Sequence, residues 1–125
     1  MIKFIDNYFS AIDNRGSILG LINFGTWGEL NLIRSEAGVI RGNHYHKSTK
    51  EGFVILSGKI EIILQKVKDG QLVGEVATYD VSEGSVFLIE PMVNHKFFIE
   101  VPSVWMNFLS LAMEASSPDI HRVSK

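Results

Sequence analysis

The sequence from residue 38 to residue 58 reads Gly-Val-Ile-Arg-Gly-Asn-His-Tyr-His-Lys-Ser-Thr-Lys-Glu-Gly-Phe-Val-Ile-Leu-Ser-Gly and contains three potential ligands, His44, His46 and Glu51. If both histidines lie on an extended strand, their imidazoles point to one face, because successive side chains alternate across a strand. The polar run between His46 and Glu51 is short enough to turn the chain and return the carboxylate to the imidazoles. This spacing indicates either a metal site or an acid/base site.

Composition limits the classes of protein to consider. The 125 residues fit one domain, which we expect to span residues 1–125, and a hydrophobic content of 46% is ample for its core. The charge is close to balance, with 12 Lys plus Arg against 14 Asp plus Glu, and there is no long basic run. We therefore expect no nucleic-acid partner.

The chain has no cysteine, which excludes a disulfide, a thiolate nucleophile and a zinc-thiolate cluster. Any metal must then be bound through nitrogen and oxygen atoms. Residues 1–10 lack a continuous apolar segment of the kind that directs export, and no later apolar run approaches the length of a membrane span. We expect a soluble, cytoplasmic protein that does not contact a membrane.

Short apolar segments alternate with turn residues along the chain. The turn Ser57-Gly58-Lys59 predicts a hairpin between strands 53–56 and 60–64, and Asp69-Gly70 predicts a second hairpin turn. Residues 2–12 fit either a short helix or a strand, and the tail from Glu114 fits a loose end or a short helix. Further strands are expected at 18–24, 27–33, 72–79, 86–89, 95–101 and 104–111.

This pattern of roughly eight or nine short strands, with almost no helical periodicity, predicts an all-β sandwich or barrel. Several of the strands are apolar on both faces. In a single small barrel the outer face should alternate with polar residues. We therefore expect the outer faces to pack together in a homodimer.

The stretch 38–58 resembles the first conserved motif of the cupins in every fixed position, which are Gly38, His44, His46, Glu51 and Gly58. A second cupin motif is identified at 84–99, where Gly84 opens the motif and His95 is its histidine. Three positions depart from the usual pattern, because Glu90, Met92 and Ile99 replace a proline, a glycine and an asparagine. The resemblance implies a single cupin domain with the double-stranded β-helix, or jelly-roll barrel, of that family.

In cupins that bind metal, the ligands occupy these motif positions, so the resemblance implies His44, His46, Glu51 and His95 as metal ligands. Three imidazoles and one carboxylate suit a divalent transition metal such as zinc, iron, manganese, nickel or cobalt. We expect no organic cofactor. The remaining histidine, His121, lies in the polar tail, and we expect it to be an ordinary polar residue.

The run from Arg41 to Lys47 resembles the Arg-Gly-x-His-x-His-Lys run of the dTDP-4-keto-6-deoxyhexose 3,4-ketoisomerases. The sequence Asp-Asn-Arg-Gly-Ser at residues 13–17 also resembles the start of those enzymes. Similar runs occur in cupin modules of capsular-sugar reductases, whose histidine-rich site binds metal. The resemblance implies catalytic roles for His44 and His46, and substrate-binding roles for Arg41 and Arg15.

Glu51 affects the choice between a metal site and a metal-free site. It stands where the ketoisomerases tend to carry glutamine, which favours a metal site.

A metal-free ketoisomerase and the direction of Arg41 can also be assessed from the sequence. A ketoisomerase moves a proton through an enediol, and imidazole, with a pKa of about 6.5, can act as both base and acid near neutral pH. Arg41 should face away from His44 on a regular strand, and it can bind a diphosphate beside the histidines only if Gly42 bulges the strand.

The sequence predicts an isomerase or epimerase of a nucleotide-linked 4-keto-6-deoxy sugar in cell-surface polysaccharide biosynthesis. One alternative is a metal-dependent cupin of another reaction class, such as a dioxygenase or lyase. The other is a non-catalytic module that binds a sugar or another small ligand. Residues that could line the barrel mouth, each with an ordinary structural role as the competing interpretation, are Met92, Asn94, Trp105 and Asn107.

Overall fold

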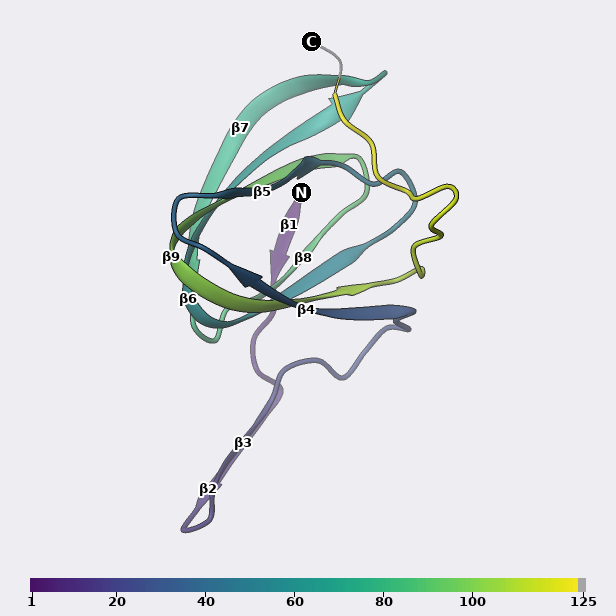
Figure 1. Ribbon diagram of the computed structural model, residues 1–125. Helices are drawn as coiled ribbons and strands as arrows, with labels where there is room; N and C mark the ends of the chain where they lie inside the picture. The colour runs from purple at the N-terminus through teal and green to yellow at the C-terminus, as the bar shows by residue number, and fades with distance from the viewer. Residues whose placement is uncertain (124–125) are drawn as a thin grey trace.

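The computed structural model describes residues 1–123, which contain nine strands and no helix (Figure 1). The predicted all-β fold is therefore confirmed. The strands are β1 (Ile2–Phe4), β2 (Phe9–Asp13), β3 (Gly16–Gly20), β4 (Glu29–Ser35), β5 (Ile40–His44), β6 (Glu51–Lys68), β7 (Gln71–Ser82), β8 (Val86–Ile89) and β9 (Val93–Leu109).

Seven strands form one antiparallel sheet that curls into a barrel (Figure 1). The order is β1-β8-β6-β9-β4, and β5 also pairs with β9 while β7 pairs with β6. The long strands β6 and β9 make the barrel possible, because each changes partner along its length. The start of β6 pairs with β8 and its end with β7, whereas the start of β9 pairs with β5 and its end with β4.

The hairpin predicted at Ser57-Gly58-Lys59 is wrong, because β6 continues through these residues with shifts of register against β9. Gly58 has a φ of 107°, and a Cβ at this position would collide with the side chain of Ser103 on β9. Glycine here permits a bulge and a close strand contact instead of a turn. Pro102 likewise lies within β9 and does not separate two strands.

The turn predicted at Asp69-Gly70 is confirmed between β6 and β7. Both residues have positive φ, 52° for Asp69 and 75° for Gly70, as a two-residue hairpin turn of type I′ requires. Residues 2–4 and 9–13 are strands and not a helix. The strand predicted at 18–24 is shorter and starts earlier, because β3 ends at Gly20.

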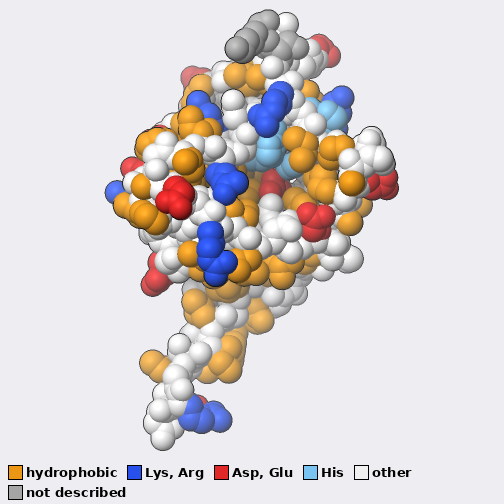
Figure 2. All heavy atoms as spheres, viewed as in Figure 1, with side chains coloured by type: hydrophobic (Ala, Val, Ile, Leu, Met, Phe, Trp, Pro, Cys, Tyr) orange, Lys and Arg blue, Asp and Glu red, His pale blue; other side chains and the backbone are white. Residues whose placement is uncertain are grey.

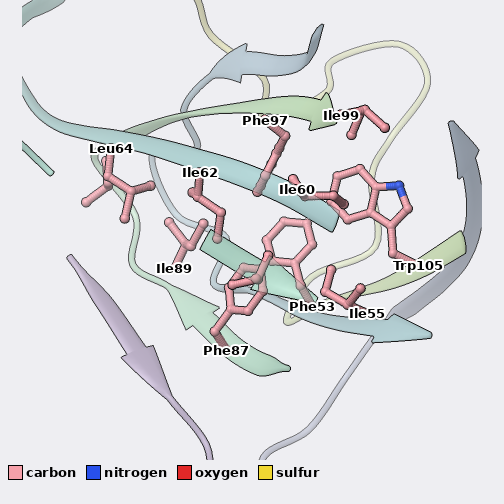
Figure 3. Packing of buried hydrophobic residues seen from close by; sticks show 12 residues of the cluster. Phe53, Ile55, Ile60, Ile62, Leu64, Phe87, Ile89, Phe97, Ile99 and Trp105 are labelled. Carbon is pink, nitrogen blue, oxygen red and sulfur yellow. The ribbon is translucent and has the colours of Figure 1, made fainter. Parts of the chain in front are cut away.

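The interior of the barrel is filled by aromatic and branched aliphatic side chains from β6, β8 and β9 (Figure 3). Phe53 lies at the centre of this core, with ring centroids 5.1 Å from Phe87 and 5.6 Å from Trp105. Its ring also lies 6.3 Å from that of His95, so the core extends directly to the histidines. Because the interior is packed in this way, the backbone beneath the histidines is fixed.

A second apolar cluster lies outside this core and contains Val54, Val86, Leu88 and Phe108. The N-terminal region of the same chain covers it with the side chains of Ile5, Leu21, Ile22 and Trp27. The edge-on contact between Trp27 and Phe108, with ring centroids 4.6 Å apart, is part of this layer. The double-sided apolar pattern at the start of β6 is thus explained within one chain.

Strands β2 and β3 form a hairpin that projects from the barrel (Figure 1). All five residues of β2 and four of the five residues of β3 are exposed. The most exposed large apolar side chains on the hairpin are Ile12, at 86%, and Ile18, at 65%. The hairpin therefore presents apolar surface to solvent in the isolated chain.

The tail from Glu114 contains no helix within the described residues, so that alternative is wrong. It runs back over the barrel and forms an antiparallel bridge between Tyr45 and His121, with N···O distances of 2.9 and 3.0 Å. The tail is therefore bonded to the segment that carries His44 and His46. Among residues 1–123 there is no helix of the length and apolar character needed to span a membrane.

Candidate functional site

The four residues identified from the cupin motifs meet at one point of the barrel. His44 ends β5, His46 lies in the loop that follows, Glu51 begins β6 and His95 lies on β9. One potential ligand atom from each residue lies within 4.8 Å of all the others. Figure 2 shows histidine side chains gathered at a hollow in the surface. The fold therefore brings the four residues named from the sequence together.

A bulge at Gly42 and Asn43 sets the direction of the ligands on β5. These residues have φ values of 75° and 61°, and the register against β9 shifts between Gly42 and His44. A Cβ at Gly42 would lie 2.9 Å from the carbonyl oxygen of His95, so only glycine allows β5 to approach β9 this closely. The bulge pairs His44 directly with His95.

The same bulge brings Arg41 to the wall of the cavity that His44 faces. The sequence predicted that Arg41 could lie beside the histidines only if Gly42 bulged the strand, and the strand does bulge there. Its guanidinium donates hydrogen bonds to Ser35 Oγ at 3.1 Å and to the carbonyl oxygen of Arg34 at 2.9 Å. These bonds hold the guanidinium at the rim of the cavity, and the residue is exposed.

Two cavities reach the cluster. The larger has a volume of about 220 Å³ and is lined by Arg41, His44, Glu51, His95 and Asn107, above the aromatic core. The smaller, of about 150 Å³, is lined by polar groups of β4, by the tail residues Met113 and Ile120, and by the buried His46. A small ligand can therefore reach the cluster through the larger cavity without displacing the tail.

Glu51 is the anionic centre of the cluster and is 5% exposed. One carboxylate oxygen, Oε1, lies 2.8 Å from His46 Nε2 and 3.3 Å from His95 Nε2. The other, Oε2, accepts a hydrogen bond from Asn107 Nδ2 at 2.8 Å. Burial alone would raise the pKa of Glu51, but the imidazoles of His46 and His95 outweigh burial and hold the pKa well below its usual value.

The imidazoles of His44 and His46 are 5.2 Å apart between ring centroids and have different environments. Burial, with the neighbouring imidazoles of His95 and His46, lowers the pKa of His44 to about 4. For His46, burial lowers the pKa, but the hydrogen bond and charge of Glu51 outweigh it and raise the pKa above its usual value. Near neutral pH, His44 is therefore neutral and His46 is the ring that more readily carries a proton.

The hydrogen bonds on the far side of two imidazoles fix which ring nitrogen faces the cluster. His46 Nδ1 lies 2.5 Å from the carbonyl oxygen of Asp119, and His95 Nδ1 lies 3.2 Å from that of Val93. A carbonyl oxygen can only accept, so both Nδ1 atoms carry a proton. In the neutral rings, the lone pairs of both Nε2 atoms then point towards Glu51.

This arrangement fits a bound divalent cation. His95 Nε2 is buried and has no hydrogen-bond partner among the described residues, because its 3.3 Å approach to Glu51 lacks hydrogen-bond geometry. Two lone pairs and a carboxylate converging on one point need either a cation or a proton between them. The cluster therefore supports the two chemistries that its sequence spacing indicated, a metal site and an acid/base site.

The predicted residue Arg15 lies away from the cluster, at the tip of the β2–β3 hairpin. Its side chain is 86% exposed and forms an ion pair with Asp13 at 2.7 Å. Within one chain, the fold does not bring Arg15 to the cavity that Arg41 lines.

Among the candidates for the barrel mouth, Trp105 belongs to the core and Asn107 contacts Glu51. Met92 has a φ of 62° at the position where the cupin motif usually has glycine, and its backbone N–H donates to the carbonyl oxygen of His46. Asn94 is buried and lies 3.4 Å from Asn43 Oδ1 through its Nδ2. Asn107 is therefore the member of this set whose side chain contacts a side chain of the cluster.

Sequence reasoning missed Asp119. Its carboxylate accepts hydrogen bonds from the backbone N–H groups of Lys47, Ser48 and Thr49, each at 2.9 Å. Burial would raise the pKa of Asp119, but the hydrogen bonds from this loop outweigh burial and lower it. No motif marks Asp119 in the sequence, because its role depends on contacts with residues some seventy positions earlier.

The barrel and its histidine cluster define a cupin that resembles the sugar-nucleotide cupins. Residues 11–106 match the family described as the polysaccharide biosynthesis C-terminal domain, and the chain belongs to this family. A search of curated protein sequences finds no match.

Among solved structures, the capsular polysaccharide assembling protein CapF from Staphylococcus aureus is 25% identical, with a TM-score of 0.70. The match covers 94% of this chain and 34% of that chain, so the present chain spans about a third of CapF. A 3,4-ketoisomerase from Helicobacter canadensis is 19% identical, with a TM-score of 0.78 over 97% of this chain and 90% of that chain.

The 3,4-ketoisomerase QdtA from Thermoanaerobacterium thermosaccharolyticum is 20% identical, with a TM-score of 0.73 over 97% of this chain and 86% of that chain. At these low identities, the two ketoisomerases establish the fold. The jelly-roll fold and the cupin resemblance expected from the sequence are confirmed.

Proposed function

We propose that residues 1–125 form one functional cupin domain that isomerises or epimerises a nucleotide-linked 4-keto-6-deoxy sugar for cell-surface polysaccharide biosynthesis. The observation that most supports this proposal is the position of Glu51. It is surrounded by imidazoles at the base of an open cavity, and Arg41 lies on the wall of that cavity. The family supports the polysaccharide context. A QdtA structure in complex with TDP-4-keto-6-deoxyglucose supports the substrate class, since QdtA shares this fold.

In this proposal His44, His46, Glu51 and His95 hold a divalent transition metal. A bound metal of this kind acts as a Lewis acid that polarises a carbonyl group. The chain contributes one carboxylate and three imidazoles, with Asn107 orienting Glu51 through the hydrogen bond to Oε2. The identity of the metal is left to elemental analysis of protein purified without chelators. Less than about a tenth of an equivalent of any transition metal would contradict this part of the proposal.

The reaction requires removal of a proton beside a ketone and return of a proton to a neighbouring atom. A ring nitrogen that binds metal cannot also accept a proton, so this acid/base role belongs to the site without metal. There His44 faces the larger cavity, and its neutral ring can accept a proton from a substrate bound at that side. In the same metal-free site, His46, whose Nε2 lies 2.8 Å from Glu51 Oε1, is the ring that holds the proton to be returned. Two imidazoles whose environments shift their pKa values in opposite directions suit such an acid/base pair.

The reaction is tested by incubating the protein with dTDP-4-keto-6-deoxyglucose in deuterium oxide. We expect solvent deuterium to enter the sugar, and we expect the His44→Asn variant to lose this exchange. Mass spectrometry of the recovered nucleotide sugar measures the uptake. If the wild-type protein incorporates no deuterium into this sugar or into related 4-keto-6-deoxy sugars, the proposed reaction is wrong.

A second candidate function is a metal-dependent cupin of another reaction class, such as a dioxygenase or a lyase. The complete four-residue donor set favours it, because such a set suits many metal-assisted reactions. Bound metal together with no deuterium exchange would favour this candidate over the isomerase.

Arg41 is proposed to bind the diphosphate of the nucleotide. Its guanidinium lies at the rim of the cavity, where a planar fork of N–H donors can contact phosphate oxygens. Arg15 is proposed as a second substrate-binding residue. Because it lies at the hairpin tip, it can reach a nucleotide sugar only in the site of a second copy, so this role requires a dimer.

We further propose that the protein is a homodimer in the cytoplasm. The exposed apolar side chains of the hairpin and of the outer face of β4, which include Ile12, Ile18, Leu30 and Leu32, support association with a second copy. A two-stranded hairpin is marginally stable by itself, so packing on a partner would stabilise it. The cysteine-free composition supports the cytoplasmic location.

A further inference from the structure

The tail at residues 119–122 lies against the segment that carries two of the four cluster residues. The backbone of His121 pairs with that of Tyr45, between His44 and His46. The guanidinium of Arg122 donates to the carbonyl oxygen of Asn43 at 3.0 Å, on the bulge that directs His44. This part of the tail lies beyond residue 106, where the match to the family ends.

Asp119 contributes most of the hydrogen bonds between the tail and this segment. Its Oδ1 accepts from the backbone N–H of Lys47, and its Oδ2 accepts from those of Ser48 and Thr49. Oδ2 also accepts from the hydroxyl of Thr49 at 2.8 Å, and Oδ1 lies 2.9 Å from His121 Nε2. One carboxylate thus satisfies three consecutive backbone donors of the loop that joins His46 to Glu51.

The main chain of Asp119 contacts the cluster itself. Its carbonyl oxygen lies 2.5 Å from His46 Nδ1, and the opposite ring nitrogen, Nε2, lies 2.8 Å from Glu51. The carboxylate therefore fixes the loop, and the carbonyl oxygen of the same residue fixes the imidazole at the start of that loop. Displacing the carboxylate would shift the carbonyl oxygen relative to His46, because both belong to one residue.

We propose that Asp119 is the positioning residue of the site, which fixes the tautomer and direction of His46 so that Nε2 faces Glu51. This inference rests on the proposed function in assigning His46 a role as a ligand or acid/base group. Hydrogen bonds of this kind on the outer side of a ligating histidine orient the ring and raise its affinity for metal. Asp119 has no contact with substrate in this account and acts through His46.

The substitution Asp119→Asn tests this inference with little change of shape. An amide has one acceptor oxygen in place of two, so its NH₂ group would face either the Lys47 N–H or the pair of donors at Ser48 and Thr49. The matched control is Glu114→Gln, which removes the same charge from an exposed position in the same tail. Circular dichroism and thermal melting first establish that both variants are folded at the temperature of the assay.

Two readouts are measured on the chain of residues 1–125. The first is the affinity for Zn²⁺, measured by competition with a chelating dye, which we expect to fall about 10- to 100-fold in Asp119→Asn. We expect Glu114→Gln to bind Zn²⁺ as the wild type does. The second readout is the ¹⁵N NMR spectrum of the histidine rings without metal, which reports whether His46 carries its proton on Nδ1. A role limited to overall stability would not change this tautomer in folded protein.

The two readouts separate failure of this inference from failure of the proposed function. The positioning role is supported if Asp119→Asn binds Zn²⁺ more weakly while Glu114→Gln does not, and if His46 in Asp119→Asn shows a mixture of tautomers. If the wild type binds no Zn²⁺, the metal part of the proposed function fails, and the NMR comparison alone decides the role of Asp119. If the wild type binds Zn²⁺, and the folded Asp119→Asn variant keeps both the wild-type affinity and the Nδ1–H tautomer of His46, the positioning role is wrong. If the wild type binds no Zn²⁺, a retained Nδ1–H tautomer in the folded variant is enough to show that the positioning role is wrong.

Discussion

At the scale of single residues, Glu51 distinguishes the two chemistries that the cluster can support. It is buried, its pKa is held low and its oxygens contact His46, His95 and Asn107. A carboxylate in this position provides negative charge for a cation, whereas glutamine would provide one neutral acceptor. The nature of the site therefore depends on this one side chain more than on any histidine.

The first prediction concerns Glu51→Gln. We expect the affinity for Zn²⁺ to fall about 100-fold or more, because a buried anionic ligand becomes neutral while the ring nitrogens remain. Competition with a chelating dye measures the affinity, and Glu29→Gln, at the smaller cavity, is the control. Unchanged Zn²⁺ affinity in Glu51→Gln would show that the carboxylate is not a ligand. Retained deuterium exchange in this variant would favour the metal-free acid/base chemistry.

The second prediction concerns the stability supplied by Asp119. Its pKa is lowered in the folded protein, so this carboxylate stabilises the fold above its unfolded pKa of about 3.8 and loses that effect as the pH falls through the lower folded value. We expect Asp119→Ala to lower the free energy of unfolding by about 1–3 kcal/mol at pH 7. Urea unfolding at a series of pH values measures this difference. A difference that stays constant down to pH 2 would contradict the account.

At the scale of elements, the bulge in β5 links the backbone to the site. A regular strand would turn Arg41 away from the cavity, whereas the positive φ values of Gly42 and Asn43 bring it to the wall beside His44. The bulge also requires close contact between Gly42 and the carbonyl oxygen of His95. A single backbone irregularity thus positions a cluster residue and a proposed phosphate ligand together.

The third prediction compares two glycines with nearly the same backbone conformation. Gly42 and Gly74 have φ values of 75° and 76°, but a Cβ at Gly74 would meet no atom within 4 Å. We expect Gly74→Ala to cost about 1–2 kcal/mol for the backbone conformation alone. Gly42→Ala should cost more, because its Cβ would also press on β9, and it should weaken Zn²⁺ binding.

Chemical unfolding and Zn²⁺ titration of the two variants measure these effects. Because φ is nearly the same at both glycines, the difference between the variants reports the contacts of the added Cβ with His95 and Phe97 on β9. Equal destabilisation, with Zn²⁺ affinity unchanged in both, would mean that the close approach of β5 to β9 is not required.

At the scale of the whole molecule, the hairpin and the outer sheet face bear on association. The chain covers Val54, Leu88 and Phe108 with its own N-terminal region, so these residues no longer argue for a partner. Ile12 and Ile18 on the hairpin remain exposed and do argue for one. The sequence predicted a dimer from strands that are apolar on both faces. In the structure, the support for a dimer comes from the exposed hairpin residues instead.

The fourth prediction is that the protein has twice the mass of one chain in light scattering at micromolar concentration. We expect the double variant Ile12→Ser and Ile18→Ser to shift this mass towards the monomer, because burial of each side chain supplies about 1.5–3 kcal/mol. Substitution of exposed Val76 on β7 by Ser is the control. A wild-type mass equal to one chain would contradict the proposed dimer.

The sequence was sufficient to predict the barrel and the members of its cluster, for definite physical reasons. Alternating apolar strands and turn residues such as Asp69-Gly70 are local signals, and His44, His46 and Glu51 form a local motif, although His46 lies in the loop beyond β5 and not on one strand with His44. The continuity of β6 through Gly58 was not predictable, because glycine serves turns and bulges alike. Only the proximity of Ser103 on β9 distinguishes the two cases.

The same reasoning explains why part of the site was missed. Asp119 lies in a polar tail without periodicity, and its partners at residues 46–49 are distant in sequence. The hydrogen bond from Asn107 to Glu51 is likewise a contact between β9 and β6 that no local pattern encodes. Residues that hold ligands in place are specified by tertiary structure, whereas the ligands themselves form a local motif.

The most direct test of the central claim is anomalous X-ray diffraction from crystals of the protein purified without chelators. We expect a single strong anomalous peak of a transition metal, bonded by His44, His46, Glu51 and His95 at the base of the cavity that Arg41 lines. An absent peak in well-ordered density, with Glu51 hydrogen-bonded directly to a protonated His46, would contradict the metal site.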